Sequence, residues 1–304
     1  MADNEHQFES DIEALMTGEL GWRRPGAAAS GTGQGKTYQR ELALDLSTLV
    51  GFVKASQSKA WAFFAKACSG IDPQREFYKK FEDAVQADGM IDVLRNGFYA
   101  NGKHFSVCFF KPENKLNETA NADYEKNICE FHRQWHYSAK EPAKSVDLML
   151  SVNGIPLVAI ELKDQLTGQT VENAKLQWMT DRNPKEAAFR LNHRCLVFFA
   201  VDLNEAWMTT RLAGEETRFL PFNQGSAGAG EDGGAGTEGR GIRRGGAQGM
   251  SAPVRRPTIS GGTFSRRILS WTSFRSSSTT TRRRRSLSSR ASISSTPCAN
   301  LSPT

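Results

Sequence analysis

Two apolar segments, Val146–Val152 and Pro156–Leu162, stand on either side of the dipeptide Asn153-Gly154. Runs of this length suit β-strands, and Asn-Gly is the dipeptide most typical of a tight turn between two antiparallel strands. The sequence therefore predicts a β-hairpin, and a hairpin fixes which side chains can share a face of a sheet.

The length of the hairpin loop decides where Asp147 and Glu161 point. A two-residue loop would pair position 147 with position 160 and place the two carboxylates on opposite faces. A three-residue loop, Asn153-Gly154-Ile155, would pair 147 with 161 and put Pro156 at the start of its strand, where its missing N–H costs least. We predict the three-residue loop, with both carboxylates on one face.

Asp147, Glu161 and Lys163 then form a set with a definite chemistry. Side chains alternate along a strand, so Glu161 and Lys163 point the same way while Leu162 turns to the other face. Two carboxylates can hold Mg²⁺, which would polarise a scissile phosphate and lower the pKa of a bound water. Lys163 would orient that water or neutralise the charge developing on phosphorus. The set predicts a metal-dependent nuclease, although the bare spacing also fits a strand that ends in solvent-exposed Glu and Lys.

The order of expected elements gives the fold class. Apolar periodicity and turn signals predict helices near Phe8–Thr17, Ser47–Ser56, Ser58–Ala67, Pro73–Asp88 and Val171–Asp181. Strands are expected near Phe105–Phe110, Val146–Val152, Pro156–Leu162 and Arg194–Asp202. Strand, strand, helix, strand around the hairpin indicates an α/β fold with a mixed sheet and helices on its faces.

A series of short segments in a fixed order carries a family resemblance. It includes Phe8–Ile12, Gly21-Trp22, Phe52-Val53, Ser56-Gln57, Val93–Gly97, Lys111-Pro112, Asn127, Arg133-Gln134, Lys144–Asp147, Val152–Leu157, Glu161–Lys163, Gly168–Val171, Met208–Thr210 and Phe219–Asn223. Through these segments, residues 8–225 resemble the N-terminal region of the restriction (R) subunit of type I restriction-modification enzymes.

The resemblance implies a nuclease domain of the PD-(D/E)xK, restriction-endonuclease-like class that cuts double-stranded DNA with Mg²⁺. The positions matching Asp147, Glu161 and Lys163 are the catalytic triad of that class, with Asp147 and Glu161 as the metal ligands. The implied partners are methylation and specificity subunits. The family also couples ATP to DNA translocation through a motor domain, which we expect this chain to lack.

Supporting positions of the family are only partly matched. Many members have a Gln-x-x-x-Tyr element on the helix after the triad, and here Ala174 stands at the glutamine position and Trp178 at the tyrosine position. Gln177 lies one turn away and could substitute, while an exposed helical glutamine is the plainer interpretation. Glu9 or Glu13 on the first helix could add a carboxylate, as in related nucleases; the alternative is a solvated helix face.

Charge divides the chain into two parts. The net charge of +6 and the pI of about 9.1 arise from the C-terminal part alone. Residues 1–225 hold 26 Lys and Arg against 30 Asp and Glu, whereas residues 226–304 hold 13 Arg, no Lys and 3 acids. The second part is rich in Gly, Ser and Arg and has too few apolar residues to offset the entropy of ordering. We expect an endonuclease domain over 1–225 and a disordered tail over 226–304.

The tail has two explanations. It could be a basic arm that binds DNA phosphates. We favour a shifted reading frame, because plausible codons for Ser289–Ser302, and for Ile259–Phe274, can spell family-like sequence in another frame. The lysine-free, Arg-rich composition also begins where the resemblance stops. Stop codons or unrelated sequence in the shifted frame of the gene would contradict the hypothesis.

Other motifs do not indicate separate sites. Ser30–Thr37 resembles a phosphate-binding loop, but Ser30 replaces its first glycine and no strand pattern precedes it, which favours a plain loop. His132 and His136 have helical spacing, yet Arg133 stands where a zinc protease needs its glutamate. We expect both histidines to cap or pack.

Compartment and activity complete the expectations. The five cysteines lack a C-x-x-C spacing, and the sequence has neither a long apolar run nor a secretory leader. These features predict reduced thiols in a cytoplasmic protein. The rival to a Mg²⁺-dependent endonuclease is a non-enzymatic remnant or scaffold that binds DNA or partner subunits without cleaving.

Overall fold

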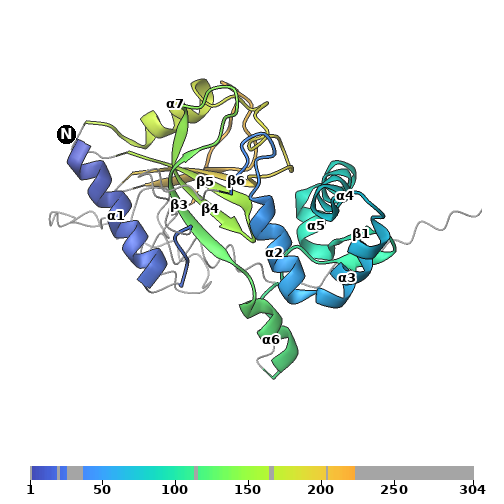
Figure 1. The fold of residues 1–304 in the computed structure, drawn as a ribbon. Coiled ribbons are helices and arrows are strands. Elements are labelled where there is room, and N and C mark those ends of the chain that lie inside the picture. Colours follow the sequence, from blue (N-terminus) through green and yellow to red (C-terminus); the bar gives the residue numbers. More distant parts are fainter. Residues whose placement is uncertain are drawn as a thin grey trace, which may run out of the picture.

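The computed structural model describes residues 2–18, 21–25, 37–112, 116–163, 168–202 and 205–222, and side chains from residue 9 onward. Within these residues a six-stranded sheet forms the centre of the fold (Figure 1). Its strands lie in sequence order: β3 (Cys129–His136), β4 (Ser145–Val152), β5 (Ile155–Leu162), β6 (Val197–Val201), β7 (Ala206–Thr209) and β8 (Leu220–Pro221). Neighbouring strands are antiparallel except β5 and β6, which are parallel, so the predicted mixed α/β sheet is confirmed.

The β4–β5 hairpin confirms the predicted facing of the carboxylates by a different route. Val152 pairs with Ile155, so the loop is the two-residue Asn153-Gly154 turn, and the prediction of a three-residue loop is wrong. A bulge then adds one residue to β5, because Leu150 pairs with Val158 while Ser151 pairs with Pro156. Beyond the bulge the register is the one that a three-residue loop would have given. The pairing of Leu148 with Ile160 brings Asp147 opposite Glu161.

The turn is locked to the helix α2 (Leu46–Ser56). Asn153 and Gly154 both have positive φ, 52° and 81°, as a tight hairpin of this type requires. The backbone N–H of Asp45, the N-cap of α2, donates to the carbonyl oxygen of Gly154 at 2.9 Å. A Cβ added at Gly154 would lie 2.4 Å from the carbonyl oxygen of Asp45, so only glycine fits there.

Two apolar cores lie on the two faces of the sheet. Alternate residues on β5 and β6, among them Ile160 and Phe199, belong to the core shared with the N-terminal helices. The residues between them, among them Ala159 and Phe198, point to the other face and pack under α7 (Val171–Thr180). Glu161 lies two residues after Ala159 on the same strand, so its side chain belongs to the α7 face.

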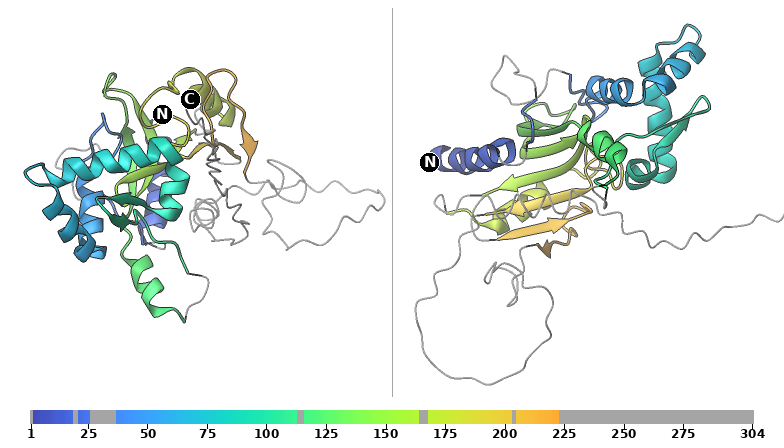
Figure 2. Two further views of the ribbon diagram at one scale, coloured as in Figure 1. Left: turned by 90° about the vertical axis from the view of Figure 1, so that its right-hand side faces the viewer. Right: turned by 90° about the horizontal axis from the view of Figure 1, so that it is seen from below.

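A helical lobe extends from one end of the sheet, while α1 (Ala2–Gly18) lies beside β3 (Figures 1 and 2). The lobe comprises α3 (Ser58–Ala67), α4 (Pro73–Asp88), α5 (Met90–Asn96) and a hairpin of β1 (Phe98–Ala100) and β2 (Lys103–Phe105). Its interior is a cluster of aromatic rings that pack against one another, mostly edge to face: Phe64, Phe77, Phe81, Phe98 and Phe105.

Most predicted helices are confirmed within a few residues, and α3 and α4 match in full. The strand predicted over Phe105–Phe110 is wrong beyond Phe105, where β2 ends. Side chains replace a neighbouring strand there: Gln57 binds both the N–H and the carbonyl of Ser106, and Asn127 does the same for Phe109. The sequence pattern missed α5, β1, α6 (Glu118–Glu125), β3, β7 and β8.

Several expectations concern residues outside the described set. The tail over 226–304 and the phosphate-loop-like segment through Lys36 lie there. Thr37 is described, and its hydroxyl donates to the carboxylate of Asp45. The four described cysteines are free thiols, and Cys68 and Cys195 are buried. Among the described helices, none is both long and apolar enough to span a membrane.

His132 packs inside the sheet, as expected of a histidine without a ligand role. It lies on β3, its Nε2 is 3.1 Å from the Ser151 hydroxyl, and burial lowers its pKa from 6.5 to about 4, partly opposed by Asp45. His132 is therefore protonated below about pH 6.5 in the unfolded chain but only below about pH 4 in the folded protein.

We therefore expect His132 to contribute a loss of about 2 kcal/mol of folding stability from neutral pH to about pH 5, because its protonation favours the unfolded chain there. Urea unfolding at the two pH values measures the change. The variant His132→Gln should lose most of that pH dependence, and an unchanged slope in it would assign the effect to other groups.

Candidate functional site

Three polar residues form a row across the first strands of the sheet. The pairing of Arg133 with Leu148 and of Trp135 with Val146 places Gln134 opposite Asp147, and Asp147 in turn lies opposite Glu161. The row therefore runs from the edge strand β3 into the buried centre of the sheet, near the end of β5 that is remote from the Asn153-Gly154 turn. The two carboxylates of the predicted metal pair are brought together.

Asp147 is held by its neighbours on both sides. Its Oδ2 accepts the backbone N–H of Leu162 at 2.7 Å, which ties the start of β4 to the end of β5. Its Oδ1 accepts a longer, weaker hydrogen bond of 3.4 Å from the Gln134 amide. The half-buried carboxylate thus keeps hydrogen-bonding capacity at Oδ1.

Glu161 is fully buried, and its two oxygens differ. Oε1 accepts a hydrogen bond from Nε of Arg182 at 2.7 Å, and Nη2 of the same guanidinium forms an ion pair with it at 2.6 Å. Oε2 has no hydrogen-bond partner among the described residues. Burial, and then the nearby charge of Asp147, raise the pKa of Glu161 well above its usual range, and Arg182 and Lys163 oppose that rise. A second cation near Oε2 would also oppose that rise, because it would stabilise the buried, ionised carboxylate.

Arg182 is a residue of this site that the sequence did not reveal. It follows α7 and is only 6 % exposed. Its guanidinium also lies 5.6 Å from the centre of the Tyr137 ring, with Nη1 3.5 Å from the hydroxyl oxygen. The local sequence Asp181-Arg182-Asn183-Pro184 is typical of an exposed loop, so no local signal marks the arginine as the partner of a buried glutamate.

Lys163 stands directly after β5, where its backbone N–H donates to the carbonyl of Val201 at 2.9 Å. This bond extends the β5–β6 pairing by one residue and fixes the direction in which the side chain leaves the sheet. The ammonium group is close enough to act on the charge of Glu161, and its residue is partly exposed. A cation at the rim of a carboxylate pair suits the role predicted for it.

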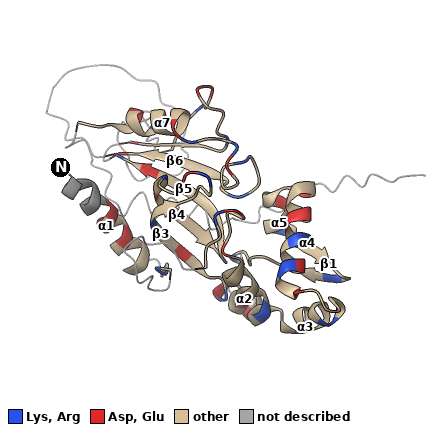
Figure 3. Cartoon of the chain, turned by 45° about the horizontal axis from the view of Figure 1, so that its top comes forward, with Lys and Arg blue, Asp and Glu red and all other residues tan. Residues whose placement is uncertain are grey.

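The first helix reaches this row through Gln134. Glu9 is 4 % exposed, and its Oε1 accepts from the Gln134 amide at 2.8 Å while Oε2 accepts from the Arg133 guanidinium. Glu13 pairs with Arg133 and Arg24 instead. Figure 3 shows the acidic residues spaced along α1. Neither glutamate lies on a solvated helix face, and of the two only Glu9 shares a hydrogen-bond donor with Asp147.

The α7 positions considered as supports have other contacts. Trp178 is fully buried, its indole N–H donates to the carbonyl of Phe199 at 2.9 Å, and its ring packs edge-on against Phe189 and Phe198. Ala174 is buried in the same core. Gln177 is half-buried. Trp178 therefore serves the packing of α7 on the sheet, which in turn positions Arg182 just after that helix.

The donor set fits a hard cation with few protein ligands. Mg²⁺ is commonly bound by one or two carboxylates and completes its octahedron with water. Asp147 and Glu161 supply two carboxylates, and the unpartnered Oε2 supplies an oxygen with free capacity. Among the described residues no group of three or more His, Cys, Asp or Glu side chains could share a metal. Any ion here would therefore rely on two carboxylates and solvent.

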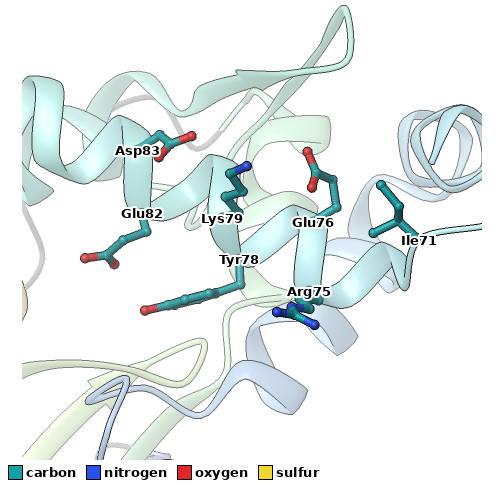
Figure 4. Close-up of a pocket in the computed structure, with 7 residues that line it drawn as sticks. All are labelled: Ile71, Arg75, Glu76, Tyr78, Lys79, Glu82 and Asp83. Atoms are coloured by element: carbon teal, nitrogen blue, oxygen red, sulfur yellow. The ribbon is translucent and has the colours of Figure 1, made fainter.

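An open pocket elsewhere has a different character. It lies along α4 in the helical lobe (Figure 4), and it is lined by Ile71, Arg75, Glu76, Tyr78, Lys79, Glu82 and Asp83. Acidic and basic side chains alternate on this surface, so it has no single-sign field to attract a charged ligand. Glu82 has a structural role, because its carboxylate accepts hydrogen bonds from Arg194 at 2.7 Å and from His193.

Comparison with known proteins identifies the family of the chain. The family model described as "Type I restriction enzyme R protein N terminus" matches residues 36–217, which is more than half of the 304 residues. The match includes all of β3 to β7 and α7, and hence Gln134, Asp147, Glu161, Lys163 and Arg182. No curated protein matches the chain. The chain therefore belongs to the family of type I restriction enzyme R subunit N-terminal domains.

Proposed function

We propose that this chain is a Mg²⁺-dependent DNA endonuclease domain that hydrolyses phosphodiester bonds in the restriction of foreign DNA. The observation that carries the proposal is the juxtaposition of Asp147 and Glu161 across β4 and β5, with Oε2 of the buried Glu161 unpartnered. A buried carboxylate oxygen without a donor is rare unless it serves a ligand or a reaction. Membership of a restriction-enzyme family supports DNA as the substrate.

Each residue has a distinct part in the proposed reaction. Asp147 and Glu161 would hold Mg²⁺, which when bound supplies Lewis-acid activation of the phosphate and of a water. The N–H of Leu162 fixes the carboxylate of Asp147, and Arg182 fixes that of Glu161 while leaving Oε2 available. Lys163 neutralises negative charge that develops on the phosphate as the new P–O bond forms.

Restriction also requires partners, which the family suggests. We propose that the chain acts together with the methylation and specificity subunits of a type I restriction complex, and that site selection belongs to those subunits. ATP-driven translocation in such a complex would act through a motor domain.

The test is nicking of supercoiled plasmid by the 304-residue chain with and without Mg²⁺. We expect nicking that requires Mg²⁺, stops with a chelator, and falls below detection in Asp147→Ala, because that variant removes a metal ligand but little buried apolar surface. Glu186→Ala, which alters a carboxylate that accepts from Ser138, is the matched control. An unmodified chain that binds DNA but never nicks it would favour the non-enzymatic scaffold.

A further inference from the structure

Gln134 has a backbone conformation that strands normally avoid. It lies in the middle of β3, yet its φ is +45°, in the left-handed region that glycine favours. The residues before and after it, Arg133 and Trp135, keep their regular pairing with β4. The distortion is therefore confined to the residue opposite Asp147. Strained conformations of this kind persist only where the surrounding contacts over-determine them.

The side chain of Gln134 has three partners that fix its orientation. Its amide nitrogen donates to Glu9 Oε1 at 2.8 Å and to Asp147 Oδ1 at 3.4 Å. Its carbonyl oxygen accepts from the Ser145 hydroxyl at 3.1 Å. A flipped amide would point its oxygen at two carboxylates, so the donor and acceptor ends are fixed by chemistry. The amide thus uses one N–H for each carboxylate.

A neutral donor at this place has a specific consequence. Arginine pairs with the other carboxylates of the network: Arg133 with Glu9 and Glu13, and Arg182 with Glu161. Asp147 instead receives hydrogen bonds from an uncharged amide and from a backbone N–H. Its position is therefore held while its negative charge stays available to a cation. Outer partners of this kind orient metal ligands and strengthen metal binding.

From these contacts we infer that Gln134 is a positioning residue for Asp147, and that the strained β3 backbone exists to place its amide between Glu9 and Asp147. This inference rests on the proposed function, since it assigns Asp147 a cation to hold. It makes α1 part of the site through Glu9, although no residue of α1 needs to touch the ion.

The experiment measures Mn²⁺ binding to the full 304-residue chain by electron paramagnetic resonance. We expect about tenfold weaker Mn²⁺ binding in Gln134→Ala and Gln134→Met, because outer partners of metal ligands contribute about that factor. Nicking by these variants should recover when the Mg²⁺ concentration is raised about tenfold. The matched control Gln86→Ala, which alters an exposed glutamine on α4, should bind Mn²⁺ like the unmodified chain.

Gln134→Gly separates backbone strain from side-chain contact. Glycine accepts the positive φ without strain, so this variant should unfold at a higher temperature than Gln134→Ala while binding Mn²⁺ equally weakly. If the variants lower the unfolding temperature but bind Mn²⁺ within about twofold of the unmodified chain, Gln134 merely ties α1 to the sheet and the inference is wrong.

The two proposals fail in different ways. An unmodified chain that binds Mn²⁺ with no effect of Gln134 substitutions overturns this inference alone. Weakened Mn²⁺ binding in the variants, without nicking by any chain, overturns the endonuclease and leaves the positioning role intact. An unmodified chain that binds no Mn²⁺ overturns both.

Discussion

Arg182→Met is expected to destabilise the folded protein by about 3–5 kcal/mol at neutral pH, because it leaves the charge of a fully buried glutamate without its partner. Arg182 supplies both the hydrogen bond and the ion pair that Glu161 receives, and the methionine keeps most of the apolar stem. Urea unfolding of the two chains measures the difference. The exposed arginine of α5 gives a matched control, and Arg95→Met should change stability by less than about 0.5 kcal/mol.

The loss of folding stability in Arg182→Met should grow as the pH rises. Burial and Asp147 already raise the pKa of Glu161 above the value of 4.5 for an exposed group, and loss of Arg182 raises it further. A carboxyl with a raised folded pKa favours folding at pH values below 4.5 and loses that contribution as pH rises through its folded pKa. The deficit of Arg182→Met should therefore be greatest at neutral to alkaline pH and shrink toward pH 4.5.

A double-mutant cycle isolates the ion pair. In the Glu161→Gln background the charge that needs Arg182 is gone, so the further change to Arg182→Met should cost much less than it does alone. A single-variant deficit below about 1 kcal/mol, or one that stays constant with pH, would show that the pair contributes little to folding.

The hairpin shows which part of a fold sequence pattern can predict. The prediction that Asp147 and Glu161 share a face comes from the loop length, because a three-residue loop puts Pro156 at the start of its strand and pairs 147 with 161. The facing of the two side chains cannot distinguish a three-residue loop from a two-residue loop followed by a bulge, since both add one residue to the β5 side. The bulge lies beside Pro156, which has no N–H for the ladder, and so the irregularity falls where a regular pair would be weakest.

The rest of the site depends on contacts between segments far apart in the sequence. β3 was missed because His132 and His136 have helical spacing and its polar residues suggest exposure. Arg133 and Gln134 are instead satisfied by Glu9 and Glu13, more than a hundred residues earlier. Arg182 was missed for the same reason, because burial of its partner Glu161 becomes visible only when α7 packs on the sheet.

Lys163→Met is expected to reduce plasmid nicking by about 10²–10³-fold, the usual effect of removing one group that stabilises charge in a transition state. Mn²⁺ binding should stay within about threefold of the unmodified chain, because Lys163 is not among the ligands. Lys163→Arg should not restore activity, since a planar guanidinium cannot replace a compact ammonium at the same point.

This contrast separates the role of Lys163 from those of its neighbours. Asp147→Ala should lose metal binding and nicking together, and Gln134→Ala should lose affinity that added Mg²⁺ restores, whereas Lys163→Met should lose nicking at every Mg²⁺ concentration. Lys185→Met, which removes an exposed lysine shortly after α7, is the matched control and should nick normally. If Lys163→Met nicks at the rate of that control, the ammonium group only supports the ionised state of Glu161, and another group must stabilise the phosphate charge.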